Sequence, residues 1–169
     1  FKDIPENKIK KPLKGLRVAP YYGCYLLRPE RVAIDNIEEP VIMAAILEKL
    51  GATPIDFPFK TECCGSYHTV SDKELVVDRV YSIIDSARRR GAEAIVQCCP
   101  LCNFNLDQRQ KDVAGKYPGF NSIPVFYITQ LMALALGLGR EVCGFELHYA
   151  DPRPLLKKLE GSSLSLIHI

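Results

Sequence analysis

Six of the seven cysteines in this 169-residue chain fall into three groups, and each group follows a short apolar run that is typical of a buried strand. The groups are Cys24, then Cys63 and Cys64, then Cys98, Cys99 and Cys102. Thiols that recur after separate strands indicate a metal site, because parallel strands deliver the residues that follow them to one edge of a sheet. The chain must therefore fold so that three distant segments meet.

The number of thiols bears on which metal they bind. The spacing C-x38-CC-x34-CxxC, which runs from Cys24 to Cys102, gathers five of them. A structural zinc ion is filled by four ligands, whereas an iron–sulfur cluster presents several irons. Five thiols therefore favour iron and sulfide, with zinc as the alternative. Cys98 directly precedes Cys99, so a ligand set that uses Cys98 is also an alternative.

Composition excludes several classes of protein. With 47% hydrophobic residues the chain can bury one core, and a net charge of +2 without a basic stripe predicts no nucleic-acid partner. We find no apolar run long enough to cross a bilayer and no secretory signal, and therefore expect a cytoplasmic protein. In a reducing compartment the cysteines stay free as metal ligands rather than forming disulfides.

The remaining periodicity predicts alternating strands and helices. We expect strands at 16–19, 53–57, 94–97 and 124–128, each followed by a helix. Ser71 and Glu74 have the spacing of a capping box at the start of the second helix. Four such units predict an α/β fold, a Rossmann-like open parallel sheet of about four strands flanked by helices. The chain has no GxGxxG, so dinucleotide binding is not implied.

Other residues near the cysteines have simpler interpretations. Cys143 lies outside every motif and is expected to be a buried apolar side chain, and His68 is expected to be a loop residue. We expect Gly65 to let the backbone pass close to the metal. Four tyrosines are expected to shield the site from water, with Tyr22 or Tyr67 as a candidate hydrogen-bond donor to substrate; they are Tyr21, Tyr22, Tyr25 and Tyr67.

The residues around the cysteines resemble a known family. The segments are Pro20-Tyr-Tyr-Gly-Cys24-Tyr-Leu-Leu-Arg-Pro29, Cys63-Cys64-Gly65 and Cys99-Pro-Leu-Cys102-Asn-Phe-Asn-Leu-Asp107. Together they resemble the cysteine-rich CCG domain of the B subunit of heterodisulfide reductase, over roughly residues 15 to 150. The family's whole subunit carries two such domains, and the chain looks most like the C-terminal one.

The resemblance implies an oxidoreductase that cleaves a disulfide reductively, such as the coenzyme M–coenzyme B heterodisulfide of methanogenesis. It implies a noncubane [4Fe–4S] cluster, held by Cys24, Cys63, Cys64, Cys99 and Cys102, with zinc or an empty site after exposure to air. The implied partners are the N-terminal CCG domain of the same subunit, a subunit with cubane iron–sulfur clusters and a flavin subunit. The isolated domain is expected to be inactive.

Two other functions are compatible with the same cysteines. One is an electron-relay domain in a complex that oxidises lactate, glycerol phosphate or succinate; the other is a structural zinc module that binds partners. For the domain organisation, we expect a lead-in at residues 1–14 and the cysteine-rich domain at 15–160. Residues 161–169 are expected to be a tail that is frayed or derived from a vector.

Overall fold

Four parallel strands form one sheet in the computed structural model, which describes residues 4–164. The strands are β1 (Arg17–Pro20), β2 (Thr53–Pro54), β3 (Ala94–Gln97) and β4 (Val125–Tyr127), and their order across the sheet is β2-β1-β3-β4. In register, Ala19 lies opposite Ile95, and Ile95 lies opposite Val125. The predicted α/β fold with a parallel sheet is confirmed.

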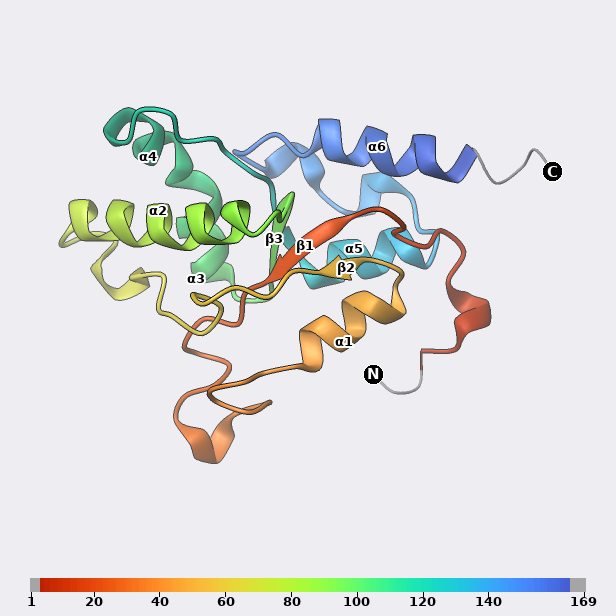
Figure 1. Ribbon diagram of the computed structural model, residues 1–169, viewed down its shortest axis with the longest axis horizontal. Coiled ribbons are helices and arrows are strands. Elements are labelled where there is room, and N and C mark those ends of the chain that lie inside the picture. Colours follow the sequence, from red (N-terminus) through yellow and green to blue (C-terminus); the bar gives the residue numbers. More distant parts are fainter. Residues whose placement is uncertain (1–3, 165–169) are drawn as a thin grey trace.

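Helices cover both faces of this sheet (Figure 1). They are α1 (Ile42–Lys49), α2 (Lys73–Arg89), α3 (Pro100–Asn103), α4 (Gln110–Lys116), α5 (Ile128–Ala135) and α6 (Arg153–Leu164), with a π-helical turn at Phe104–Gln108 between α3 and α4. Short 3-10 turns lie at Glu6–Lys8, Glu30–Val32, Ser66–His68, Arg140–Val142 and Phe145–Leu147.

The strands divide the interior into two cores, because successive side chains point to opposite faces of a sheet. Val18, Val96 and Phe126 pack with α1, α5 and α6 on one face, which we call the α1 face. The other face, the α2 face, contains Ile95 and Val125 together with α2 and the turn before α4. This separation decides where each cysteine lies.

Two local predictions need correction. Asp72, not Ser71, caps α2, and its Oδ1 accepts from the Leu75 amide at 3.1 Å. An ionised carboxylate is the stronger acceptor beside the positive end of a helix. Strand β2 is also shorter than expected, at two residues on the sheet edge, where Pro54 is tolerated because the amides that donate towards β1 are those of Thr53 and Ile55.

The chain on either side of the central units packs on the core. The amides of Lys10 and Lys11 donate to the carbonyl of Ala135, and Leu13 is buried. At the other end, residues 161–164 continue α6, and residues 165–169 lie outside the described part of the chain. The division into lead-in, domain and tail stays a prediction.

Gln110, the first residue of α4, forms hydrogen bonds with the segment that leads into β4. It is buried; its Nε2 donates to the carbonyls of Leu106 and Ile123 at 2.8 Å each, and its Oε1 accepts from the Ile123 amide at 3.0 Å. We expect Gln110→Leu to lower the free energy of unfolding by about 2–4 kcal/mol, since it strands buried backbone groups.

Urea denaturation of the wild-type chain and the variant measures this difference. Lys111→Leu, at the next and exposed position of α4, is the matched control and should leave the midpoint nearly unchanged. Equal midpoints for Gln110→Leu and wild type would show that these three hydrogen bonds do not stabilise the fold.

Candidate metal centre

The three cysteine groups meet beyond the carboxyl ends of the strands. The Cys24 and Cys63 sulfurs lie 3.7 Å apart, and those of Cys64 and Cys102 lie 3.5 Å apart. Cys99 packs against the same part of the core as Cys64 and Cys102. All seven cysteines are free, so these contacts are between thiols and not disulfides. The five cysteines named from the sequence are thus brought together.

The sheet separates Cys98 from Cys99. The side chain of Cys98 packs on the α1-face core, whereas Cys99 packs on the α2-face core, which contains Cys64 and Cys102. Cys99 has extended backbone angles, φ −100° and ψ 122°, so the alternation of β3 continues through it. Burial raises the pKa of Cys98. Cys99 is therefore the member of this pair that shares a side with the other thiols.

Cys143 and His68 lie apart from this group. The Cys143 sulfur is buried near the carbonyls of Gly139 and Gln130, at 3.7 and 3.9 Å, and burial raises its pKa. His68 is exposed on the turn that follows the second cysteine group.

The CxxC segment owes its geometry to the start of α3. Cys99 is the residue before the helix and Pro100 is its first residue, where a missing amide costs nothing. The Cys99 carbonyl accepts from the Asn103 amide at 2.9 Å, which closes the turn. Cys102 is consequently buried one turn after Cys99, in contact with Cys64.

Two glycines lie beside the sulfurs, Gly23 next to Cys102 and Gly65 next to Cys63. A Cβ added to Gly23, whose φ is +63°, would lie 3.3 Å from the Cys102 sulfur and 3.2 Å from Tyr21 Cε1. One added to Gly65 would meet Val76 of α2 instead, at 3.3 Å. Gly65 lets its loop pack on α2, and its amide donates to the Cys63 sulfur at 3.3 Å. The backbone at Gly65 thus passes close to a predicted ligand, as expected, and Gly23 is a second glycine at the site.

Of the four flanking tyrosines, Tyr21 faces the thiols. Its buried hydroxyl donates to the Glu62 carbonyl at 2.6 Å, and its pKa is raised far above the usual value, first by burial and then by the charges of Cys102, Cys64, Cys63 and Cys24. Tyr22 packs on the α1 face, where its hydroxyl accepts from the Met43 amide at 2.9 Å. Tyr25 and Tyr67 are 73% and 79% exposed, so they do not form the expected shield.

The thiols differ in how readily they ionise. The pKa of Cys64 is lowered to about 6, first by the hydrogen bond between its sulfur and that of Cys102 and then by hydrogen bonds from Ser66 and Asn105. The same contact with Cys64, together with burial, raises the pKa of Cys102. Burial and the Cys63 contact raise the pKa of Cys24 to about 11.

These residues fit an iron–sulfur cluster in the chemistry of their donors. Within residues 4–164, no three His, Cys, Asp or Glu side chains are already placed to hold a single metal ion. The five thiols come from three separate loops, Gly23 leaves the backbone close to the sulfurs, and Tyr21 borders them on the protein side. Iron–sulfur clusters are bound through such thiolates, which ligate more than one iron.

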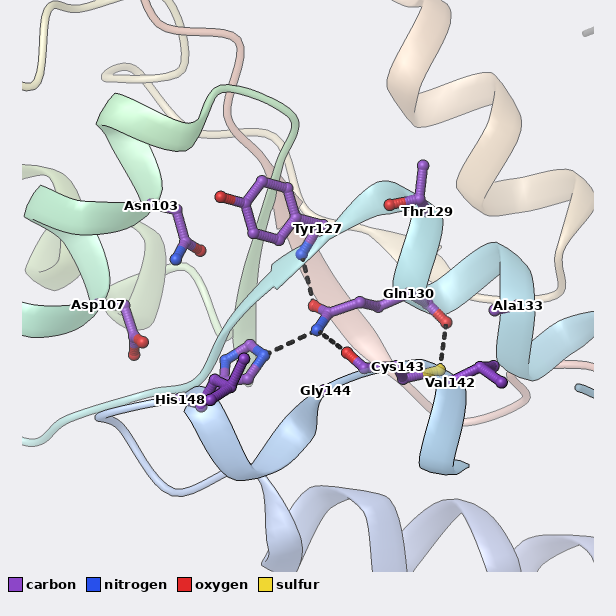
Figure 2. Close-up of a pocket in the computed structure, with 11 residues that line it drawn as sticks. Asn103, Asp107, Tyr127, Thr129, Gln130, Ala133, Val142, Cys143, Gly144 and His148 are labelled. Carbon is purple, nitrogen blue, oxygen red and sulfur yellow. Dashed lines mark hydrogen bonds between the residues drawn. The ribbon is translucent and has the colours of Figure 1, made fainter. Parts of the chain in front are cut away.

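A cavity of about 480 Å³ opens beside α3, one residue beyond Cys102 (Figure 2). Asn103 and Asp107 line it on the side of the helix, and Tyr127, Gln130 and His148, which are linked by hydrogen bonds, also line it. Both carboxylate oxygens of Asp107 accept backbone amides, from Tyr149 and Ala150 at 2.9 Å each. The sequence did not indicate this cavity, because only Asn103 and Asp107 belong to a motif and the opposite wall comes from segments that carry none.

The hydrogen bonds of Gln130 determine which ring nitrogen of His148 carries the proton. The Gln130 Oε1 accepts from the Tyr127 amide at 2.8 Å, so its Nε2 donates to the Cys143 carbonyl at 2.7 Å and to His148 Nε2 at 2.9 Å. Burial lowers the pKa of His148. The neutral ring therefore carries its proton on Nδ1.

The chain is similar in sequence to subunits of known reductases. One relative is the 8-methylmenaquinol:fumarate reductase membrane anchor subunit of Wolinella succinogenes, 34% identical over 152 residues, or 89% of this chain and 53% of the relative. Another is the B subunit of the ferredoxin/F(420)H(2)-dependent CoB-CoM heterodisulfide reductase of Methanosarcina acetivorans, 31% identical over 177 residues, or 98% and 57% of the two chains. The chain spans about half the length of the curated relatives it matches.

A solved structure supports the fold alone. A hypothetical protein from Helicobacter pylori superposes with a TM-score of 0.66 at 12% identity, over 85% of this chain and 26% of that one.

In residues 4–164, no helix has both the length and the apolar character to cross a bilayer.

The family assignment rests on the segment that holds all five converging cysteines. A family model described as the CCG cysteine-rich domain matches residues 18–107, more than half of the chain. The match begins in β1, before Cys24, and ends at Asp107, after Cys102. The chain therefore belongs to the CCG cysteine-rich domain family.

Proposed function

We propose that this chain is the iron–sulfur domain of a heterodisulfide reductase B subunit, with a noncubane [4Fe–4S] cluster held by five cysteines. The ligands would be Cys24, Cys63, Cys64, Cys99 and Cys102. The observation that carries this proposal is the meeting of five thiols at one sheet edge, with Cys98 on the opposite face. Relatives named as heterodisulfide reductase B subunits support it.

The substrate in this proposal is a disulfide, such as that of coenzyme M and coenzyme B. Cleavage of an S–S bond takes up two electrons and leaves two thiolates. A bound cluster would supply iron that can accept a sulfur as the bond breaks. The chain's own residues hold the thiols at the edge of the sheet, and Tyr21 closes the protein side against water.

The electrons would have to come from partners. No second group of cysteines accompanies these five within residues 4–164, and the sequence has no GxGxxG. We therefore propose an N-terminal CCG domain in the same subunit, a subunit with cubane clusters and a flavin subunit as partners. The cytoplasmic location expected from the sequence stays a prediction.

A second candidate is an electron-relay domain in another oxidoreductase complex. The relative named as a menaquinol:fumarate reductase subunit favours it. In that case the thiols would hold a cluster that passes electrons without binding a disulfide. A disulfide added to the reconstituted protein should change the cluster's spectrum under the first proposal and leave it unchanged under the second.

Metal analysis tests the proposal against the zinc alternative. After anaerobic reconstitution with iron and sulfide in the presence of zinc, we expect the full chain to contain iron and sulfide in similar amounts and little zinc, because five thiolates exceed what one zinc ion binds. Elemental analysis with visible spectra measures this. Protein that takes up zinc and no sulfide would instead establish a zinc module.

Substitution of single cysteines tests the ligand set. We expect Cys64→Ala and Cys99→Ala to lose most of the iron, because both side chains belong to the group that meets on the α2 face. Cys98→Ala and Cys143→Ala are matched controls that should retain most of it, since Cys98 packs on the opposite face and Cys143 lies elsewhere. Iron loss from Cys98→Ala equal to that from Cys99→Ala would show that the wrong member of the pair was chosen.

Turnover tests the need for a second domain. We expect the reconstituted chain to show a cluster spectrum but no sustained reduction of the coenzyme M–coenzyme B heterodisulfide by a chemical reductant. The reason is that cleavage of the disulfide takes up two electrons, whereas the single group of cysteines in this chain would hold only one cluster. Activity should appear when the N-terminal half of the subunit is present in the same polypeptide. Steady turnover by the chain alone would show that one cluster suffices.

A further inference from the structure

Asn105 is a fully buried polar residue that lies against one of the converging thiols. It is 0% exposed and belongs to the π-helical turn Phe104–Gln108, three residues beyond Cys102. A π-turn adds a residue to the helix at the cost of regular hydrogen bonding, and such turns recur at functional sites. Here the turn places an amide side chain next to Cys64.

The hydrogen bonds of Asn105 fix which end of its amide faces the sulfur. Its Oδ1 accepts from the hydroxyl of Thr69. Its Nδ2 donates to the Cys64 carbonyl at 3.2 Å and to the Cys64 sulfur at 3.7 Å. A reversed amide would place its oxygen against the carbonyl and the sulfur, which are both acceptors. The donor end therefore points at Cys64.

A second set of contacts holds Thr69 in place. Arg109 Nη2 donates to the Thr69 carbonyl at 3.2 Å, and Arg109 Nη1 donates to Asp112 at 3.2 Å. The Arg109 guanidinium also lies over the Phe104 ring, 5.5 Å from its centroid. Arg109, directly after the π-turn, thus holds the loop that carries Thr69, and Phe104 at the start of the turn packs on the Arg109 guanidinium.

We propose that Asn105 is a positioning residue that raises the reduction potential of the cluster by donating a hydrogen bond to the Cys64 sulfur. The inference rests on the proposed function, since it takes Cys64 as a cluster ligand. Reduction brings one electron into the cluster and increases the negative charge on its sulfurs, so a donor at a sulfur stabilises the reduced form more than the oxidised form. Thr69 contributes by keeping the amide in its donating orientation.

The experiment is a redox titration of the anaerobically reconstituted full chain, with dithionite as the one-electron reductant and absorbance and electron paramagnetic resonance as readouts. The variants are Thr69→Val, Asn105→Ala and Asn105→Asp. Asn121→Asp is the matched control, because Asn121 is exposed and its Nδ2 donates to the Gly119 carbonyl, in the loop before β4. Iron content is measured for each protein.

We expect the potential to fall in the order wild type, Thr69→Val, Asn105→Ala, Asn105→Asp. The first variant loosens the donor, the second removes it and the third replaces it with a carboxylate. At the wild-type midpoint, the ratio of reduced to oxidised cluster should drop about tenfold in Asn105→Ala, which for one electron corresponds to about 59 mV. Asn121→Asp should titrate like wild type.

The outcomes separate this inference from the proposed function. Wild-type potentials in Asn105→Ala and Thr69→Val, with full iron content, would overturn the role of Asn105 and leave the cluster itself established. A wild-type chain that forms no iron–sulfur spectrum would overturn the proposed function and this inference with it. If Asn105→Asp fails to fold, the other two variants still decide the matter. Loss of iron without a change in potential would assign Asn105 a structural role only.

Discussion

The alternation of side chains along β3 is the constraint on which the arrangement of the thiols depends. From Ala94 to Cys99 the even-numbered residues that join a core pack on the α1 face, and the odd-numbered ones pack on the α2 face. A shift of one residue would exchange Cys98 and Cys99 and place the sulfur of Cys98 on the α2 face. The same shift would move the side chain of Ile95 out of the α2-face core. Ile95 lies on β3, which pairs with β1 on one side and β4 on the other, so the shift would disrupt the centre of the sheet.

Much of the fold could be predicted from local patterns. The stripe Val76, Val80, Ile83 and Ile84 is buried in α2 as its spacing indicates, and β3 has the limits expected from its apolar run. Errors arose where a local pattern has two readings. Ser71 and Asp72 both resemble a helix cap, and only the packed loop decides between them. Helix α6 was not predicted. Its buried residues Leu155 and Leu156 are adjacent, and the polar residues that follow them hide the apolar spacing of a helix.

The site was predictable to the extent that its residues carry motifs. Spacing gathered the cysteines and left Cys98 as an alternative, the family resemblance selected the five, and the structure brings them together. The roles of Gly23 and Asn105 were not foreseen, because each depends on a neighbour that only the fold supplies: the Cys102 sulfur for Gly23 and Cys64 for Asn105. Gly23 directly precedes Cys24, and that adjacency was the one signal that could have indicated it.

The distribution of protons among the thiols connects the fold to metal binding. The pKa of Cys64 is lowered, whereas a neighbouring sulfur and burial raise the pKa values of Cys102 and Cys24. A metal that binds all of these sulfurs must displace the protons of the two thiols whose pKa is raised, so binding becomes more favourable as the pH rises.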